Sequence, residues 1–335
     1  MTISYQPFDL LLKYPFRISG HSRISTPIML VAIHYEGLIG MGEASMVPYM
    51  GESIQSATQF LKDLDLSWLN YPFNYPEVVQ YLDAKAPGNP AIKAAIDIAL
   101  HDLEGKLLKN PCYSLLNSNP GDMPLTSVTI GMDLPEIIIQ KVKDAEVAKI
   151  LKVKLGSEED KILIETIRSV TNKPLFVDAN QGWTDKEKAL DFIYWLKDQG
   201  VQLIEQPMLK DDRTSNAWIT ERSPLPILAD ESVQRLADIE LIKDAYHGIN
   251  VKLMKSGGMY EAHQMIRRAK ELKMKVLIGC MSETSIATLA AAALAPLCDW
   301  ADIDGPFLTS NNPFKIPEFK DGKWVLNDGF GLGLK

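Results

Sequence analysis

The 335-residue sequence contains little cysteine, and its three cysteines fit neither a disulfide framework nor a metal site. Cys112, Cys280 and Cys298 are odd in number and lack the close spacing that is typical of zinc ligands. We therefore expect reduced thiols in a cytoplasmic protein, because structural disulfides persist mainly in oxidising compartments.

Long apolar runs and an excess of positive charge are also missing. The N-terminus has no basic stretch followed by an apolar one, so we expect no signal peptide. The most apolar segment, 286–297, is too short to span a bilayer. A net charge of −8 argues against nucleic acid or an anionic membrane as a partner.

The first part of the chain mixes strand and helix signals. Residues 28–36 and 40–45 alternate around a three-residue connection and predict a β-hairpin. Apolar residues spaced three and four apart predict helices at 52–65, 75–84 and 90–108. We interpret residues 1–122 as an α+β domain.

From about residue 124 onward, short apolar strands alternate with amphipathic helices such as 158–170 and 185–198. This alternation predicts a (β/α)-type barrel that lacks its last helix, over residues 123–314. Residues 315–335 are expected to return to the N-terminal domain. The predicted strands are 125–131, 149–155, 174–178, 201–205, 226–230, 247–253, 275–281 and 298–303.

Carboxylates end three adjacent strands of this barrel. Asp178, Glu205 and Asp230 would meet at the C-terminal mouth, where active sites of such barrels form. Three carboxylates this close repel one another unless a cation lies between them. Oxygen ligands with room for water favour Mg²⁺ over zinc, so we predict a magnesium site.

Lysines end the strands on either side of these three. Lys154, with Lys152 on the same strand face, precedes them, and Lys252 follows them. A nearby cation lowers the pKa of an ammonium group and favours a neutral amine that can act as a general base. Two such bases across one carbon would remove a proton from one face and return one to the other, which inverts a stereocentre.

These residues resemble the enolase superfamily, specifically its muconate-lactonising-enzyme subgroup. The resemblance covers nearly the whole chain and implies a modified (β/α)₇β barrel with an N-terminal α+β capping domain. Barrels of this type often assemble, which allows a homo-oligomer. The motifs that carry the resemblance are AAIDIALHDLEGK at 94–106, the Lys152/Lys154 pair, DAN at 178–180, EQP at 205–207, DES at 230–232 and KLMKSGG at 252–258.

The resemblance implies a role for each of these positions. Asp178, Glu205 and Asp230 resemble the ligands of one Mg²⁺ per subunit, and Lys154 and Lys252 resemble the two bases. Whether Lys252 or Lys255 is the second base stays open at this point. Supporting or substrate-facing roles are implied for Lys152, Asn180, Glu231, Lys255 and Glu283.

The residues at the end of the eighth strand indicate which class of substrate the protein binds. Asp302 and Asp304 are similar to the Asp-x-Asp element of dipeptide epimerases, where two carboxylates on one strand face hold the free ammonium of a dipeptide. We therefore expect an isomerase that epimerises the second residue of an Ala-Xaa dipeptide. The alternatives within the subgroup are an o-succinylbenzoate synthase, an N-acylamino acid racemase and a cycloisomerase.

Residues 17–26 are expected to form a lid loop over the second side chain of the substrate. Epimerases for Ala-Glu place an arginine in this loop, whereas here His21 occupies about that position and Arg23 follows two residues later. A neighbouring apolar loop at 46–52 completes the predicted lid. We therefore expect a small or hydrophobic second residue.

Overall fold

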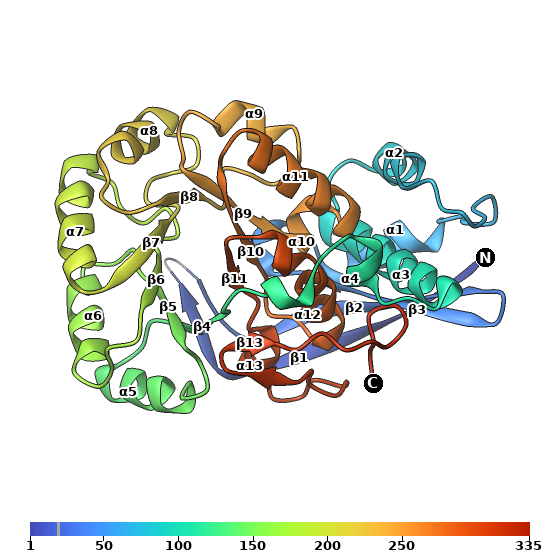
Figure 1. The fold of residues 1–335 in the computed structure, drawn as a ribbon, viewed down its shortest axis with the longest axis horizontal. Helices are drawn as coiled ribbons and strands as arrows, with labels where there is room; N and C mark the ends of the chain where they lie inside the picture. Colours follow the sequence, from blue (N-terminus) through green and yellow to red (C-terminus); the bar gives the residue numbers. More distant parts are fainter. Residues whose placement is uncertain (19–20) are drawn as a thin grey trace.

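The computed structural model of the protein describes residues 1–18 and 21–335, apart from the side chains of Ile18, His21 and Tyr49. Two sheets dominate it: a three-stranded antiparallel sheet at the N-terminus and an eight-stranded parallel sheet. Figure 1 shows the parallel strands surrounded by helices, with the N-terminal sheet lying to one side. This is the capped (β/α)₇β barrel that the sequence predicts.

The N-terminal part consists of a strand meander followed by helices. The strands pair in the order β1-β2-β3, and α3 packs across β3. Gly42 allows this close packing, because a Cβ there would lie 1.8 Å from the carbonyl oxygen of Ala95 on α3. The elements are β1 (Thr2–Ile18), β2 (His21–Tyr35), β3 (Leu38–Ser45), η1 (Pro48–Met50), α1 (Ile54–Lys62), α2 (Tyr75–Lys85), α3 (Pro90–Leu108), α4 (Cys112–Leu115) and η2 (Pro120–Asp122).

The prediction of a lid loop at 17–26 was wrong. Apart from residues 19 and 20, which are not described, this segment belongs to strands β1 and β2. The first strand escaped detection because Pro7, Pro15 and the apolar run at 10–12 hide its alternation. Proline is tolerated there because β1 is an edge strand of its sheet.

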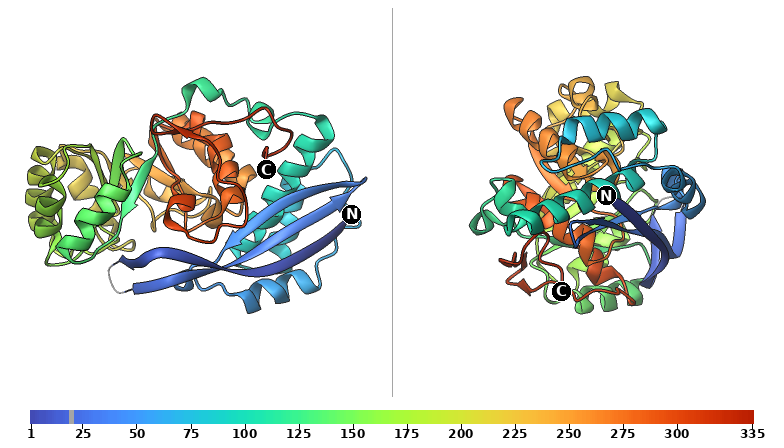
Figure 2. Two further views of the ribbon diagram at one scale, coloured as in Figure 1. Left: turned by 90° about the horizontal axis from the view of Figure 1, so that it is seen from below. Right: turned by 90° about the vertical axis from the view of Figure 1, so that its right-hand side faces the viewer.

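The β1–β2 hairpin projects from the N-terminal sheet along the barrel (Figure 2). Its far end is held against α5 (Pro135–Asp144), the first helix of the barrel, and against the residues just before it. The Arg17 guanidinium lies 2.8 Å from the Asp133 carboxylate, and the Tyr14 hydroxyl donates to Asp144 at 2.5 Å. The hairpin therefore covers one side of the barrel mouth.

The eight parallel strands run from β4 to β11 in sequence order, and an isolated bridge between Thr126 and Ala301 joins the two edges. The helix that follows the last strand, α13, has only four residues. The barrel therefore lacks a full eighth helix, as the sequence predicts. The strands are β4 (Ser127–Ile130), β5 (Ile150–Lys154), β6 (Leu175–Asp178), β7 (Val201–Glu205), β8 (Ile227–Ala229), β9 (Gly248–Lys252), β10 (Lys275–Gly279) and β11 (Trp300–Asp302).

Helices follow each barrel strand and cover its outer face (Figure 1). Beyond α13, a short hairpin of two strands leads to the C-terminus. The helices are α5 (Pro135–Asp144), α6 (Asp160–Arg168), α7 (Lys186–Asp198), α8 (Arg213–Arg222), α9 (Asp238–Ile242), α10 (Leu253–Ser256), α11 (Met259–Glu271), α12 (Ser285–Leu294), η3 (Ala295–Leu297) and α13 (Gly305–Leu308); the hairpin strands are β12 (Phe319–Lys320) and β13 (Lys323–Trp324).

Strand periodicity stacks two layers inside the barrel. One residue from each of five strands forms a buried apolar cluster. Side chains two positions further along a strand point to the same face, one layer nearer the mouth. The polar residues that follow the apolar layer therefore lie directly above a layer that excludes water. The cluster consists of Ile150, Phe176, Leu203, Leu228 and Leu277.

Carboxylates from the N-terminal part bind the beginnings of two barrel helices. Glu43 on β3 accepts hydrogen bonds from the backbone N–H and hydroxyl of Thr284, at 2.8 and 2.5 Å, where α12 begins. Asp97 on α3 accepts one from the N–H of Met259, the first residue of α11, at 2.5 Å. The free N–H groups of a helix N-terminus need acceptors, which these side-chain oxygens supply, so the contacts link the two parts of the chain.

The C-terminal segment runs back to α3 and α4. Cys112 N–H donates to the Gly331 carbonyl at 2.7 Å, and Leu332 N–H donates to the Asp102 carboxylate at 2.8 Å. The division into domains at 1–122, 123–314 and 315–335 remains a prediction. Among the described residues, no helix combines the length and apolar character needed to cross a bilayer.

Stability should depend on pH through Glu43. Burial raises the pKa of this carboxyl to about 7, although its hydrogen bonds to Thr284 oppose the shift. Between its ordinary value and about 7 the folded protein holds a proton that the unfolded chain has lost. The free energy of unfolding should therefore fall as pH rises through this window, by on the order of 3 kcal/mol from this group.

Urea unfolding at pH 5 and pH 7.5, with wild type and Glu43→Gln, measures this contribution. The fall between the two pH values should be smaller in the variant, because glutamine does not titrate. Equal falls in the two proteins would contradict the assignment to Glu43.

Candidate active site

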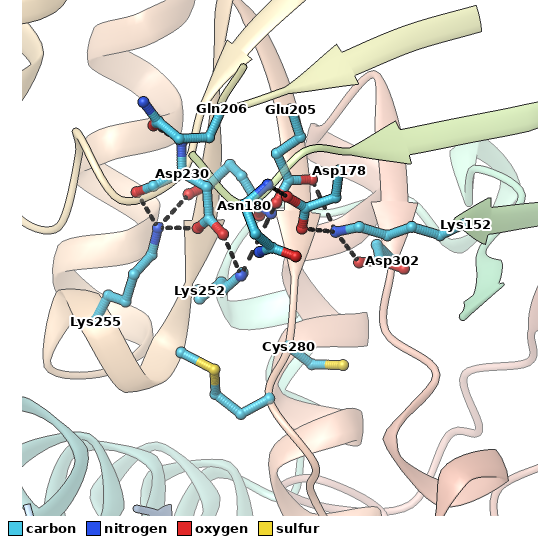
Figure 3. Close-up of polar contacts among 12 residues, drawn as sticks. Lys152, Asp178, Asn180, Glu205, Gln206, Asp230, Lys252, Lys255, Cys280 and Asp302 are labelled. Atoms are coloured by element: carbon cyan, nitrogen blue, oxygen red, sulfur yellow. Dashed lines mark hydrogen bonds and ion pairs between the residues drawn. The ribbon is translucent and has the colours of Figure 1, made fainter. Parts of the chain in front are cut away.

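Three carboxylates converge at the barrel mouth, as predicted. Asp178 ends β6, Glu205 ends β7 and Asp230 directly follows β8. All three side chains are buried, and each offers an oxygen within 4.8 Å of those of the other two. Figure 3 shows them pointing toward one another, with lysines approaching from both sides.

The pKa values of this cluster show how strongly its charges interact. Burial alone would raise the pKa of Asp178, but the Lys154 and Lys152 ammonium groups lower it to about 2. Burial raises the pKa of Glu205 to about 8, and repulsion from Asp178 adds to this effect. Burial would also raise the pKa of Asp230, but the Lys252 and Lys255 ammonium groups outweigh this effect. The pKa of Asp230 therefore lies well below its ordinary value.

The cluster fits a hard divalent cation. Its donors are oxygens only, which suits Mg²⁺, an ion that usually keeps several water ligands. Among the described residues, three further buried oxygens near the cluster, Asn180 Oδ1, Glu231 Oε2 and Asn250 Oδ1, have no hydrogen-bond donor. Groups of this kind suit the hydrogen bonds of metal-bound water.

Lys152 lies within the cluster and bridges it to the eighth strand. Its ammonium contacts Glu205 at 2.8 Å, Asp302 at 2.7 Å and Asp178 at 3.3 Å. Burial would lower the pKa of Lys152, but Asp302 and the other carboxylates raise it well above its ordinary value. Lys152 therefore stays charged and acts as a fixed cation for the carboxylates.

Lys154 and Lys252 face the same cavity from strands on opposite sides of the three carboxylate-bearing strands. Lys154 binds Asp178 at 2.5 Å, and Lys252 binds Asp230 at 2.6 Å. The mutual placement that the strand spacing predicts is therefore present.

The geometry separates Lys252 from Lys255, which the sequence alone could not. The Lys255 ammonium is bound by Asp230 Oδ1 at 2.5 Å and by the backbone carbonyls of Asp230, Val233 and Asn250. It does not line the cavity, whereas Lys252 does. Lys255 is thus placed to support Asp230, and Lys252 is placed to meet a substrate.

Asp302 and Asp304 both line the cavity, but they differ in their partners. Asp302 accepts from the Ser127 hydroxyl at 2.6 Å with one oxygen and from Lys152 with the other. Asp304 accepts from the Thr129 N–H at 2.6 Å and from the Cys280 thiol at 3.6 Å. Burial and repulsion from Asp302 raise the pKa of Asp304 to about 6. A substrate cation would relieve this repulsion, so Asp304 is the better placed of the two to receive one.

Three other predicted residues have different placements. Arg23 lines the cavity, where its guanidinium donates to Ser282 Oγ at 3.0 Å and lies over the Phe16 ring. The side chain of His21 lies outside the described residues. Glu283 is buried behind the cavity lining and accepts from the Met281 N–H at 2.9 Å, which favours support over substrate contact.

Several residues of the site were not predicted from the sequence. Asn250 donates to Glu205 at 2.8 Å, and its place two residues before Lys252 on one strand was the available signal. Gly279 makes room for it, because a Cβ there would lie 2.4 Å from Asn250 Oδ1. Gln206, which the sequence singled out only as part of the EQP motif and without a role, accepts from the Asp230 N–H at 3.0 Å.

Removal of a cluster carboxylate should abolish stabilisation by metal. Mg²⁺ that binds only the folded protein raises the free energy of unfolding by about 2.7 kcal/mol at 100 times its Kd. We expect Mg²⁺ to raise the Tm of wild type and not that of Asp230→Asn. Asp238→Asn, at the start of α9, serves as a control, and an equal rise in Asp230→Asn would contradict the proposed ligand set.

Comparison with known proteins identifies the family. Residues 138–335 match the model described as "Enolase C-terminal domain-like", and residues 5–117 match "Mandelate racemase / muconate lactonizing enzyme, N-terminal domain". The sequence is 49% identical to the L-Ala-D/L-Glu epimerase of Bacteroides thetaiotaomicron, covering 100% of this chain and 88% of that protein. It is 38% identical to an L-Ala-D/L-amino acid epimerase of Pedosphaera parvula, covering 94% of this chain and 92% of that protein.

The fold is also similar to solved structures. A dipeptide epimerase from Enterococcus faecalis, crystallised with Mg and the dipeptide L-Leu-L-Tyr, superposes with a TM-score of 0.90 at 31% identity. The similarity covers 99% of this chain and 98% of that one. The resemblance seen in the motifs is confirmed over both parts of the chain: it belongs to the mandelate racemase/muconate lactonizing enzyme family of the enolase superfamily.

Proposed function

We propose that this protein is a Mg²⁺-dependent dipeptide epimerase that inverts the α-carbon of the second residue. The observation that carries the proposal is one cavity that holds two opposed lysines, Lys154 and Lys252, together with Asp302 and Asp304. The similar proteins of Bacteroides thetaiotaomicron and Pedosphaera parvula are epimerases of Ala-containing dipeptides by name, and the solved relative binds Mg and a dipeptide.

Asp178, Glu205 and Asp230 are the residues that would hold the metal. When bound, Mg²⁺ supplies positive charge that stabilises the negative charge that develops on the substrate carboxylate as the α-proton leaves. Lys152 and Lys255 hold the three carboxylates in place through the contacts described above. The buried oxygens of Asn180 and Glu231, which have no donor among the described residues, could accept hydrogen bonds from water on the metal.

Lys154 and Lys252 would carry the proton from one side of the α-carbon to the other. One amine removes the α-proton, and the ammonium on the opposite side returns a proton to the other face. Each lysine must lose its contact with Asp178 or Asp230 to act as a base. General acid–base groups of this kind typically contribute 10²- to 10⁴-fold to the rate.

The free ammonium of the substrate would bind at Asp304, with Asp302 behind it. A charge-assisted hydrogen bond to a buried carboxylate is stronger than a neutral one. Substrates of the alternative reactions, by o-succinylbenzoate synthases, N-acylamino acid racemases and cycloisomerases, lack such an ammonium. Near their anionic groups two buried aspartates would be unfavourable, so these reactions fit the cavity less well.

The side chain of the second residue has two candidate classes. The apolar residues Met46 and Val47 led to the prediction of a small or hydrophobic side chain, which stays a prediction. The position of Arg23 in the cavity lining favours an acidic side chain as the second candidate, because a guanidinium pairs with carboxylates in bidentate geometry. The 49% identical relative carries Glu in its name, which supports this candidate.

The remaining proposals concern the surroundings of the protein. We propose a cytoplasmic location, supported by three cysteines that are all free thiols. A small dipeptide is the proposed partner, and the net charge of −8 argues against nucleic acid. A homo-oligomer stays a prediction from the behaviour of related barrels.

Epimerisation in D₂O tests the function directly. With Mg²⁺ present, an Ala-Xaa dipeptide should gain one deuterium at the α-carbon of its second residue and become a mixture of epimers. Mass spectrometry and chiral chromatography report these changes. The N-acetylated dipeptide, which has no ammonium, should react about 100-fold more slowly, which corresponds to about 3 kcal/mol for a buried partner left unpaired. Exchange in N-acyl amino acids but in no dipeptide would contradict the proposal.

The same dipeptide library ranks the two side-chain classes. Arg23→Met keeps the length of the side chain and removes its charge. It should lower kcat/KM for Ala-Glu relative to Ala-Leu by about 100-fold if Arg23 binds the acidic group. Arg17→Met, on the same strand pair but paired with Asp133, is the matched control. An unchanged ratio would exclude Arg23 as the acidic-group partner.

A further inference from the structure

Gln206 is a buried residue beside the carboxylate cluster, and its amide binds the segment that carries Asp230. Its side chain is fully buried, and its Oε1 accepts hydrogen bonds from the backbone N–H groups of Asp230 and Ser232, at 3.0 and 3.1 Å. Its Nε2 donates to the Met208 carbonyl oxygen at 3.1 Å and to the Tyr246 hydroxyl at 2.8 Å. Figure 3 shows this side chain beside Asp230, and Gln206 is not among the described residues that line the active-site cavity. Gln206 is therefore placed to hold Asp230 and not to meet a substrate.

The backbone of Gln206 links this contact to the other two carboxylates. Gln206 directly follows Glu205, which ends β7. Its carbonyl oxygen accepts a hydrogen bond at 2.9 Å from the N–H of Gln181, which lies in the segment after Asp178. One residue thus joins the three segments that carry the carboxylates of the cluster.

The backbone conformation of Gln206 indicates that these contacts hold it in place. Its φ is 40°, in the left-handed region, which is unfavourable for most residues other than Gly, Asn and Asp. Asn180 and Gln181 share this region, with φ of 45° and 64°. Conformations of this kind persist where the surrounding structure fixes them, and they cluster at functional sites. The turn after Glu205 is therefore a fixed feature of the site.

Asp230 depends on Gln206 because it lies beyond the end of its strand. β8 ends at Ala229, and the N–H of Asp230 binds the side chain of Gln206. The carbonyl oxygen and the carboxylate of Asp230 bind the Lys255 ammonium, at 2.7 and 2.5 Å. Gln206 and Lys255 together therefore set the position of the third carboxylate relative to the other two.

We propose that Gln206 is a positioning residue of the metal site, and that it makes the site prefer Mg²⁺ over the larger Ca²⁺. The proposal rests on the proposed function, because it takes Asp178, Glu205 and Asp230 as the metal ligands. Mg²⁺ requires nearly ideal octahedral geometry, whereas Ca²⁺ accepts longer and more variable distances. A carboxylate that is held from two sides suits the ion with the stricter requirement. If Asp230 could move, the site would lose more affinity for Mg²⁺ than for Ca²⁺.

A purely structural role is the competing explanation, because a buried amide can also stabilise a loop far from any ligand. Asn216 has that role in the same part of the chain. It is fully buried, like Gln206, and among the described residues its side chain binds only backbone groups, those of Met208, Leu209 and Asp212. Asn216→Leu is therefore a matched control for the loss of a buried amide.

Metal titrations of three proteins test the proposal. Gln206→Met keeps the length of the side chain and leaves the Asp230 N–H without its acceptor. Isothermal titration calorimetry of metal-free wild type, Gln206→Met and Asn216→Leu gives the Kd of Mg²⁺ and the Kd of Ca²⁺. We expect Gln206→Met to raise the Kd of Mg²⁺ about 10- to 100-fold, the usual effect of removing a group that holds a metal ligand. The Kd of Ca²⁺ should rise less. Asn216→Leu should lower the Tm and leave both Kd values unchanged.

Tyr246→Phe gives a second variant if Gln206→Met does not fold, because it removes only one hydroxyl that binds the Gln206 amide. It should also raise the Kd of Mg²⁺ more than that of Ca²⁺, by a smaller amount. Equal rises for the two ions would overturn the proposal, as would an equal change in Asn216→Leu. If wild type binds Mg²⁺ and the Gln206 and Tyr246 variants bind it equally well, only the proposal about Gln206 fails. If wild type binds no Mg²⁺, the metal requirement of the proposed function fails with it.

Discussion

The repulsion among three buried carboxylates is the constraint on which the rest of the active site depends. Asp178, Glu205 and Asp230 bring their oxygens within 4.8 Å of one another in a place that water hardly reaches. Burying a charge without a partner is costly. Four lysines meet that requirement, and each of them comes from β5 or from the β9–α10 segment. The cations that neutralise the cluster are therefore the same lysines that can transfer protons or hold the carboxylates in place.

The hydrogen bonds of the four lysines indicate a different role for each pair. Lys152 and Lys255 are surrounded by acceptors and stay in place, whereas Lys154 and Lys252 each bind one carboxylate closely and line the cavity. The barrel makes this arrangement possible because every second residue of a strand points inward. The apolar layer below the cluster excludes water, and the helices held by Glu43 and Asp97 keep the N-terminal part over the mouth.

Much of this arrangement was predictable, because it depends on periodicity. The barrel strands lie within about two residues of their predicted ends, and the order of Lys154, the three carboxylates and Lys252 along the strands determines their order around the barrel. What depends on contacts between distant segments was not predictable. The binding of Asp302 by Lys152 is one example, and the extension of β2 back to His21, which makes Arg23 part of a strand and not of a lid loop, is another. The choice between Lys252 and Lys255 also required the structure, since three residues separate them in the sequence.

Single-lysine variants test the central claim, that two bases act on opposite faces of one carbon. Lys154→Ala and Lys252→Ala are each incubated with Mg²⁺ and D₂O, once with the L,L and once with the L,D epimer of a dipeptide that wild type converts. The account predicts that neither variant epimerises the dipeptide, but that each still exchanges the α-proton of one epimer, and that the two variants exchange opposite epimers. Exchange of the same epimer by both variants, or continued epimerisation by either, would contradict it.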